Sequence, residues 1–361
     1  PPLMATARKP RQPRQPSEST AAHPLERYPV LGICGQSGAG KTTLIEALIP
    51  KLRDTGLRVA VVKDGARRVR VDTPGKDSDR FFTAGADTAL FGDQHFMRHH
   101  QPMDLTAFLV TLCASYDMVL VEGHASTKVP KIWLTMPDDA PLLENRDHIL
   151  HVLERDQATV DNVLELLLDH LQQTWQQTPV WGCLLIGGKS RRMGRPKHLI
   201  EQQGKTWLEK AVAKLTPRVD QLVISGSGCI PDDLAALPRI PDAPGLAGPL
   251  AGILSVMRWQ PTVSWLVMAC DLPDVEDGAL SWLLDQRYPG VRAILPDLQA
   301  DGRLEPLLAW YDFRCRPLLE TIAASGHLRL SRLARQEGIC VAQPPEELHH
   351  SWRNVNTPED L

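Results

Sequence analysis

The sequence predicts an α/β protein built from two doubly wound, mainly parallel sheets. The 361 residues exceed one ordinary domain, because a typical domain takes roughly 150 residues. Short apolar runs typical of buried strands alternate along the chain with amphipathic segments of helical spacing. Two of these apolar runs lead directly into glycine-rich loops, at Gly35 and at Gly187. Since ligands of such sheets bind at the carboxyl ends of strands, the two loops mark two expected sites.

The overall charge argues against a nucleic-acid or membrane-surface partner. The chain has 40 basic and 43 acidic side chains and a net charge of −3, which leaves no broad basic surface. Its seven cysteines never form a Cys-x-x-Cys pair, so we expect reduced thiols rather than a zinc site or disulfides. No apolar run in the sequence approaches the ~20 residues of a membrane span. We therefore expect a soluble, cytoplasmic protein with no nucleic-acid and no membrane partner.

Composition also predicts the domain boundaries. Residues 1–28 are rich in proline, glutamine, serine and basic residues, so we expect a disordered tail, with a docking role for its cations as the alternative. The expected domains are residues 29–172 and 180–361, joined by a polar linker at 173–179. Apolar residues at helical spacing predict that a helix at 156–171 closes the first domain.

The first glycine loop matches the pattern Gly-x-x-x-x-Gly-Lys-Thr and predicts a P-loop NTPase fold. An apolar strand at Val30–Cys34 precedes the loop and an amphipathic helix follows it, which is the context that this motif requires. The loop amides would surround the nucleotide phosphates, Lys41 would reach the β and γ phosphates, and the Thr42 hydroxyl would bind Mg²⁺. The predicted nucleotide-binding residues are Gly35, Gln36, Ser37, Gly38, Ala39, Gly40, Lys41, Thr42 and Thr43.

Other metal candidates in this domain are one carboxylate and three histidines. Glu122 ends a predicted strand at 116–123, where an acid commonly contacts Mg²⁺ directly or through water. An acid that faces solvent is the alternative. His95, His99 and His100 lie in a polar stretch that we expect to be irregular and without a matching carboxylate, so we predict surface histidines.

The second glycine loop has the composition of a phosphate site. After the apolar run that begins at Cys183, Gly187 and Gly188 allow main-chain amides to approach a polyphosphate. The cations that follow are Lys189, Arg191, Arg192 and Lys197. Arg192 and Lys197 are the catalytic candidates, because cations along such a loop can neutralise charge on a departing pyrophosphate. A solvated basic loop is the alternative.

Asp271 is the third catalytic candidate. It directly follows a predicted strand at 265–270, and Pro273 turns the chain after it. A carboxylate at this edge of the sheet can hold Mg²⁺ against the α-phosphate during nucleotidyl transfer. A helix N-cap is the alternative role for Asp271. The glycine-rich segment 245–252 can lie beneath a base or ribose, or only form a turn.

Residues 29–172 resemble the molybdopterin-guanine dinucleotide biosynthesis adapter, a small P-loop GTP-binding protein. The resemblance rests on Gly35–Thr43, the Asp-x-Pro-Gly-Lys-Asp-Ser segment from Asp72, Ala84-Gly85-Ala86 and Val121-Glu122-Gly123. It implies a GTP-binding domain that assists delivery or release of a cofactor and is a candidate for oligomer contacts. Where that family has a basic, His-rich segment, this chain has Asp64–Arg68.

Residues 179–361 resemble molybdenum cofactor guanylyltransferase, which has a Rossmann-like nucleotidyltransferase fold. The resemblance rests on the loop from Leu185 to Lys197, on Gly248-Pro-Leu-Ala-Gly252 and on Asn354-Val-Asn-Thr-Pro-Glu-Asp360. It implies that GTP is bound by Leu185, Ile186, Gly187, Gly188, Lys197, Ser225, Asp242, Gly248 and Asp271, and the second substrate by Asn354 and Asn356. The chain departs from the family's pattern at Pro196, Ser225, Ile186 and Glu305.

The resemblance implies transfer of GMP from GTP to molybdopterin, with Mg²⁺ as cofactor and pyrophosphate as the second product. The candidate metal ligands are Asp271 in the second domain and Thr42 and Glu122 in the first. Candidate partners are cofactor-insertion proteins and molybdoenzymes. Two alternatives remain open at this point: a cytidylyltransferase of the same fold, and a GTP-dependent adapter whose transferase half only binds the cofactor.

Overall fold

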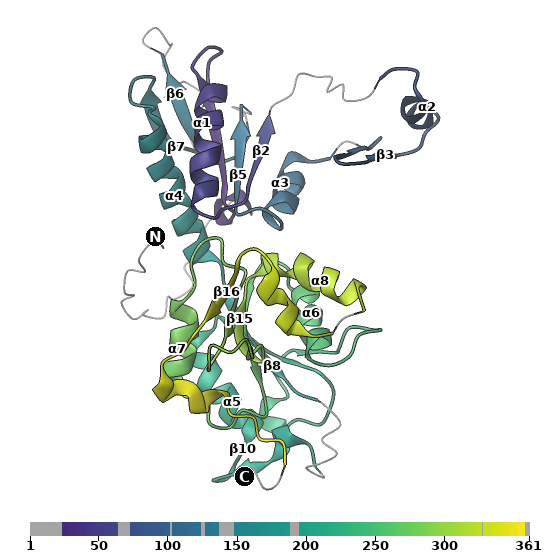
Figure 1. The fold of residues 1–361 in the computed structure, drawn as a ribbon, viewed down its shortest axis with the longest axis vertical. Coiled ribbons are helices and arrows are strands. Elements are labelled where there is room, and N and C mark those ends of the chain that lie inside the picture. The colour runs from purple at the N-terminus through teal and green to yellow at the C-terminus, as the bar shows by residue number, and fades with distance from the viewer. Residues whose placement is uncertain are drawn as a thin grey trace. The chain divides into compact units, whose positions relative to one another are not determined.

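The computed structural model describes residues 24–63, 73–101, 103–123, 127–136, 148–187, 195–326 and 328–357. The chain divides between Leu168 and Asp169 into two compact units (Figure 1). Each unit contains a largely parallel sheet with helices packed on it, which confirms the predicted fold class. None of the described helices is both long enough and apolar enough to cross a membrane.

The N-terminal unit has a five-stranded sheet in which all strands are parallel. The strand order is β2 (Val59–Lys63), β5 (Met118–Glu122), β1 (Val30–Gly35), β6 (Lys131–Thr135) and β7 (Ile149–Glu154). One face is covered by η1 (Pro24–Arg27) and α3 (Leu105–Cys113), and Leu25, Leu109 and Cys113 join a core with Val119 and Val121. The expectation of a disordered tail is therefore wrong for residues 24–28. Helix α1 (Lys41–Asp54) follows β1 and its loop, and contacts β1, β2 and β5. The expected strand, loop and helix of a P-loop domain are therefore present.

The expectation of an irregular segment around His95 is wrong. Strands β3 (Thr88–Phe91) and β4 (His95–Arg98) form an antiparallel hairpin after the short helix α2 (Asp77–Thr83). A matching carboxylate also exists, because Asp87 accepts hydrogen bonds from the His100 amide at 2.9 Å and lies 3.0 Å from His99 Nδ1. The three histidines are exposed, as predicted.

The predicted linker is largely helical. Helix α4 (Val160–Gln177) continues through most of residues 173–179, and β8 begins at Val180. Glutamine is a good helix former, and Thr174 and Trp175 are buried, with Arg287 stacked over the Trp175 ring. A polar composition alone therefore did not distinguish a linker from the last turns of an amphipathic helix.

The C-terminal unit has a seven-stranded sheet with a single antiparallel strand. The order is β12 (Arg239–Ile240), β11 (Gln221–Ser225), β8 (Val180–Leu185), β13 (Ser264–Ala269), β15 (Leu308–Tyr311), β14 (Ala293–Pro296) and β16 (Ile339–Ala342). Only β15 runs antiparallel to its neighbours among these strands. The predicted mainly parallel sheet is thus confirmed, and β8 lies beside β11 and β13, so its end is flanked by the ends of both.

Two apolar cores hold this sheet, one on each face. Helices α5 (Trp207–Leu215) and α7 (Asp277–Asp285) pack on one face, and α6 (Pro249–Trp259) and α8 (Arg316–Ala324) on the other (Figure 1). The side chains of β13 alternate between the cores, with Leu266 and Met268 in the first and Trp265 and Val267 in the second. A sheet covered on both faces leaves the strand ends as the natural place for ligands.

Candidate functional site

The P-loop of the N-terminal unit is shaped by a close approach between β1 and β6. Gly35 has φ of 143°, and a Cβ placed there would lie 2.5 Å from the Leu134 carbonyl oxygen, so no larger residue fits. The Lys41 ammonium donates to the carbonyl oxygens of Gly35 at 3.0 Å and Gln36 at 2.6 Å. This cation therefore rests on the main chain of its own loop.

Glu122 connects the P-loop to the neighbouring strands. The Thr42 hydroxyl donates to Glu122 Oε1 at 2.8 Å, and Lys63 Nζ lies 3.3 Å from Oε2. The Glu122 side chain is only 12 % exposed, so it faces these two residues rather than solvent. The structure thus brings together both predicted metal ligands of this unit. Lys63 was not predicted, although it ends its strand as Glu122 does, which is the signal that could have found it.

The second loop begins where β8 and β11 end. Ile186 is buried and its amide donates to the Ser225 carbonyl oxygen at 2.8 Å. Gly187 has φ of 122°, a conformation that favours glycine, and among the described residues no atom beyond its chain neighbours lies within 4 Å of a Cβ placed there. Gly188 and Arg192, with Lys189 and Arg191, lie outside the described residues. Their predicted roles stay predictions.

Three predicted site residues meet at the carboxyl end of β13. Lys197 Nζ donates to Asp271 Oδ2 at 2.9 Å and to Asn356 Oδ1 at 2.8 Å. The side chains of Lys197 and Asp271 are only 15 % and 21 % exposed. Asp271 Oδ1 is buried and has no hydrogen-bond partner among the residues that the structure describes. The site is therefore an ion pair with one unsatisfied carboxylate oxygen, and the Cys270 amide joins it to the strand before the glycine loop by donating to the Leu185 carbonyl oxygen at 3.1 Å.

A small apolar cluster brings the C-terminal segment to this ion pair. Val355, Ile200 and Trp207 are buried together, and the Val355 amide donates to the Asp271 carbonyl oxygen at 3.1 Å. Trp207 is the first residue of α5, which is capped by a reciprocal pair of hydrogen bonds between Thr206 and Glu209. Burial of Val355 thus places Asn356 next to Lys197. The sequence showed these apolar residues but not their contact.

The two alternatives for Asp271 can now be compared. Helix α7 begins only at Asp277, with Glu276 at its N-cap, so Asp271 is not a helix cap. The unsatisfied Oδ1 fits a cation, and an oxygen ligand suits Mg²⁺. Among the described residues, however, no group of three or more His, Cys, Asp or Glu side chains could hold a metal. A magnesium ion here would take its other ligands from substrate phosphates and water, which is usual for this ion.

Cys270 directly precedes Asp271 but is not a candidate nucleophile. Burial, reinforced by the Asp271 carboxylate, raises the pKa of the Cys270 thiol to about 12. The thiol therefore stays protonated near neutral pH.

The remaining predicted residues gather around the N-terminal half of α6. A Cβ on Gly252 would lie 2.8 Å from Leu185 Cδ2, 3.0 Å from Ser225 Oγ and 3.5 Å from Asp242 Oδ1. Ser225 is buried and its hydroxyl donates to the Gly252 carbonyl oxygen at 3.2 Å, so this hydroxyl is already engaged within the protein. Asp242 is exposed overall, but desolvation by the surrounding atoms raises the pKa of its carboxyl.

Gly248 and Asn354 complete the predicted set. Gly248 is the N-cap of α6 with φ of 71°, a conformation that favours glycine, and Pro249 follows as the first helical residue. Asn354 is half-buried in the same segment as Asn356.

Comparisons with known proteins divide the chain in the same way. Residues 30–155 match the family model of molybdopterin guanine dinucleotide synthesis protein B, and residues 182–340 match that of the MobA-like NTP transferase domain. A probable molybdenum cofactor guanylyltransferase of Bacillus cereus (strain AH187) is 31% identical over 186 residues, covering 50% of this chain and 92% of that protein. A molybdenum cofactor biosynthesis bifunctional protein of Synechocystis is 32% identical over 186 residues, covering 51% of this chain and 53% of that protein.

Solved structures resemble each unit separately. Molybdopterin-guanine dinucleotide biosynthesis protein A from Archaeoglobus fulgidus is 27% identical, with a TM-score of 0.42, covering 50% of this chain and 94% of that chain. Bacillus subtilis MobB is 20% identical, with a TM-score of 0.29, covering 40% of this chain and 97% of that chain.

The fold and the site at the end of β8 and β13 define the C-terminal unit as a nucleotidyltransferase. The chain belongs to the molybdenum cofactor guanylyltransferase family and carries, in addition, an N-terminal MobB domain.

Proposed function

We propose that the C-terminal unit transfers GMP from GTP to the terminal phosphate of molybdopterin and releases pyrophosphate. The observation that carries this proposal is the arrangement of Lys197 between Asp271 and Asn356, at the strand end where the Cys270 amide donates to the Leu185 carbonyl oxygen before the glycine loop. The names of the relatives support guanine and molybdopterin as the substrates.

The chemistry that this site must perform is positioning and charge neutralisation. The acceptor phosphate is already anionic, so it needs no general base. Lys197 offers its ammonium to the phosphates, and its two acceptors keep that ammonium oriented while the nucleotide is absent. Mg²⁺, which Asp271 would hold, would neutralise charge on the α-phosphate and the leaving pyrophosphate.

The nucleoside would lie against the segments that surround Gly252. Leu185 and Asp242 lie next to Gly252, and the Gly248 turn begins α6, whereas Ile186 packs in the core on the other face of the sheet. Since the Ser225 hydroxyl is bonded to Gly252, we propose that Ser225 contributes through its main chain. Asn354 and Asn356 would contact the second substrate, since an amide both donates and accepts hydrogen bonds.

The N-terminal unit would bind GTP at its P-loop. Lys41 would exchange the carbonyl oxygens of Gly35 and Gln36 for the β and γ phosphates, and Thr42 with Glu122 would hold the accompanying Mg²⁺. In this proposal the unit assists delivery or release of the cofactor to insertion proteins and molybdoenzymes.

The test compares nucleotides in the full chain. The protein is incubated with molybdopterin, Mg²⁺ and GTP, CTP or ATP, while pyrophosphate release and the dinucleotide product are measured. We expect GTP to give the fastest turnover. Equal or faster turnover with CTP would identify a cytidylyltransferase, and no turnover with any nucleotide would identify a cofactor-binding adapter.

A further inference from the structure

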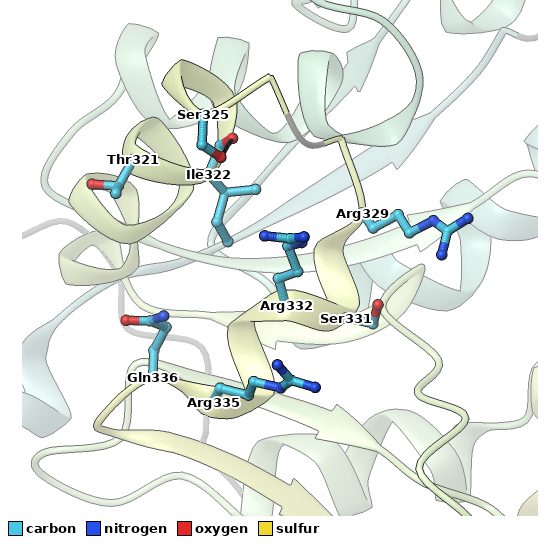
Figure 2. A pocket seen from close by; sticks show the side chains of 8 residues that line it. All are labelled: Thr321, Ile322, Ser325, Arg329, Ser331, Arg332, Arg335 and Gln336. Atoms are coloured by element: carbon cyan, nitrogen blue, oxygen red, sulfur yellow. Dashed lines mark hydrogen bonds between the residues drawn. The ribbon is translucent and has the colours of Figure 1, made fainter.

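A cavity of about 380 Å³ lies in the C-terminal unit between α8 and η7 (Leu330–Arg335). Its wall contains Arg329, Arg332 and Arg335, together with polar side chains and Ile322 of α8. Figure 2 shows Arg332 between the two helices with its guanidinium toward Ile322, while Arg329 and Arg335 come from the two ends of η7. A volume of this size is within the range of small-ligand sites.

The 3₁₀ geometry of η7 places Arg332 and Arg335 on one side of the helix. A 3₁₀ helix has three residues per turn, so side chains at i, i+3 and i+6 lie above one another. Leu330 and Leu333 form one such row and are buried in the core beneath the helix. Arg332 and Arg335 form the next row, about 6 Å apart along the axis since each residue rises about 2 Å, and Arg329 precedes them at the extended N-cap position.

The three arginines of the cavity lack an acidic side chain that would compensate their charge. None of the residues that line the cavity is acidic. In the part of the chain that the structure describes, none of the three guanidinium groups makes an ion pair or a side-chain hydrogen bond. The nearest acid on the facing helix, Glu320, is engaged by Arg258 at 2.6 Å. Three like charges around one cavity repel one another, and a bound anion would reduce that repulsion.

We propose that this cavity is a binding site for a polyphosphate anion, either free pyrophosphate or the phosphates of a nucleotide. Guanidinium groups bind phosphate oxygens through paired, charge-assisted hydrogen bonds. Three guanidinium groups around one cavity therefore suit an anion with several phosphate groups better than a single carboxylate. The hydroxyl of Ser325 and the amide of Gln336 in the wall offer further donors.

This site is separate from the proposed transfer site. The cavity is built by α8 and η7, which pack on the face of the sheet that α6 covers, whereas Lys197 and Asp271 lie at the ends of β8 and β13. Loss of one site is therefore measurable without loss of the other.

The test follows local protection in the intact chain, because the transfer site and the P-loop also bind phosphates. Hydrogen exchange of the segment 328–336 is measured while inorganic pyrophosphate or GTP is titrated. We expect protection, and the Arg332→Gln variant should need at least about tenfold more ligand, as expected for loss of a hydrogen bond to a charged group. Arg303→Gln is the matched control, since its side chain is 89% exposed and outside the cavity.

A second variant tests the same proposal in case Arg332→Gln does not fold. Arg329→Gln with Arg335→Gln changes two exposed side chains and should weaken protection at least as much, with an unchanged thermal midpoint and unchanged nucleotide transfer. Protection by pyrophosphate alone would identify the free anion as the ligand, and stronger protection by GTP a nucleotide. The proposal fails if millimolar pyrophosphate and GTP leave the segment unprotected, if protection does not depend on Arg332, or if only an acidic peptide such as polyglutamate protects it.

Discussion

The two units each present a lysine to a glycine loop, but they hold it in different ways. In the N-terminal unit Lys41 donates to main-chain oxygens of Gly35 and Gln36, six and five residues earlier in its own loop. In the C-terminal unit Lys197 donates to side chains of Asp271 and Asn356, which are 74 and 159 residues away. One site is therefore a property of a local motif, and the other a property of the folded unit.

This difference predicts different sensitivities to mutation. Both acceptors of Lys41 belong to its own loop, so the position of this lysine does not depend on the docking of a distant segment. The Lys197 site depends on the docking of the C-terminal segment through Val355 and on one carboxylate whose other oxygen is unsatisfied. We therefore expect the largest effects of single substitutions at Asp271.

The first prediction concerns the charge of Asp271. Asp271→Asn keeps the size of the side chain and removes its charge, so it should lower the rate of GMP transfer about 10²- to 10³-fold, as loss of a well-placed electrostatic contact does. Nucleotide affinity should change less, because metal placement matters most in the transition state. Steady-state transfer at saturating Mg²⁺ measures the effect.

The control for this variant is Asp232→Asn, the same substitution at an exposed residue of the same unit. Both variants should unfold at the wild-type temperature. Near wild-type turnover of Asp271→Asn would remove Asp271 from the proposed metal site.

The second prediction separates the two lysines. In the full chain, Lys41→Ala should weaken GTP-dependent protection of residues 35–43 in hydrogen exchange about 10- to 100-fold, since one charged hydrogen-bond donor to the phosphates is lost. Transfer of GMP should not change. Lys51→Ala on the same helix, where Lys51 pairs with Asp161 at 2.8 Å, should leave both properties intact. A parallel loss of transfer in Lys41→Ala would show that the two sites work together.

The third prediction uses two glycines of the P-loop. Gly35→Ala should destabilise β1 by about 2 kcal/mol, because the backbone at φ of 143° is strained for alanine and the new Cβ would meet the Leu134 carbonyl oxygen. Gly38 also has a positive φ, of 86°, but no atom lies within 4 Å of its added Cβ, so Gly38→Ala should cost only about 1 kcal/mol. Native-state hydrogen exchange of β1 amides measures both. Equal losses would mean that the contact with Leu134 is relieved without cost.

The same difference explains which parts of the fold could be predicted from the sequence. The P-loop, its preceding strand and its following helix are contiguous, so one pattern predicted all three. The strand order could not be predicted in the same way, because β1 pairs with β5 and β6, and such pairings join residues as distant as Gly32 and Val121. The alternation of strands and helices indicated only that the sheets would be mainly parallel.

Two local predictions failed because tertiary contacts outweighed composition. The polar segment before β8 is helical, since Trp175 and Thr174 are buried. The histidine-rich segment forms a hairpin, and its end is bound by Asp87, which lies 12 residues before His99 and 13 before His100. Neither the burial of Trp175 nor the contacts of Asp87 could be identified from sequence spacing alone.

The smallest expected effect concerns Asn356, which either orients Lys197 or contacts only the second substrate. Asn356→Ala removes one of the two acceptors of Lys197 Nζ, at 2.8 Å, and leaves the ion pair with Asp271. Loss of one such hydrogen bond should lower transfer about tenfold. If Asn356 acts by orienting Lys197, the double variant with Lys197→Ala should be no slower than Lys197→Ala alone, because the group being oriented is already gone. If Asn356 instead contacts only the second substrate, the two losses should multiply, and the loss in Asn356→Ala should appear in KM for molybdopterin rather than in kcat. Measuring kcat and KM for the wild type, the two single variants and the double variant distinguishes these outcomes, and multiplicative losses would show that the contact with Lys197 is incidental to transfer.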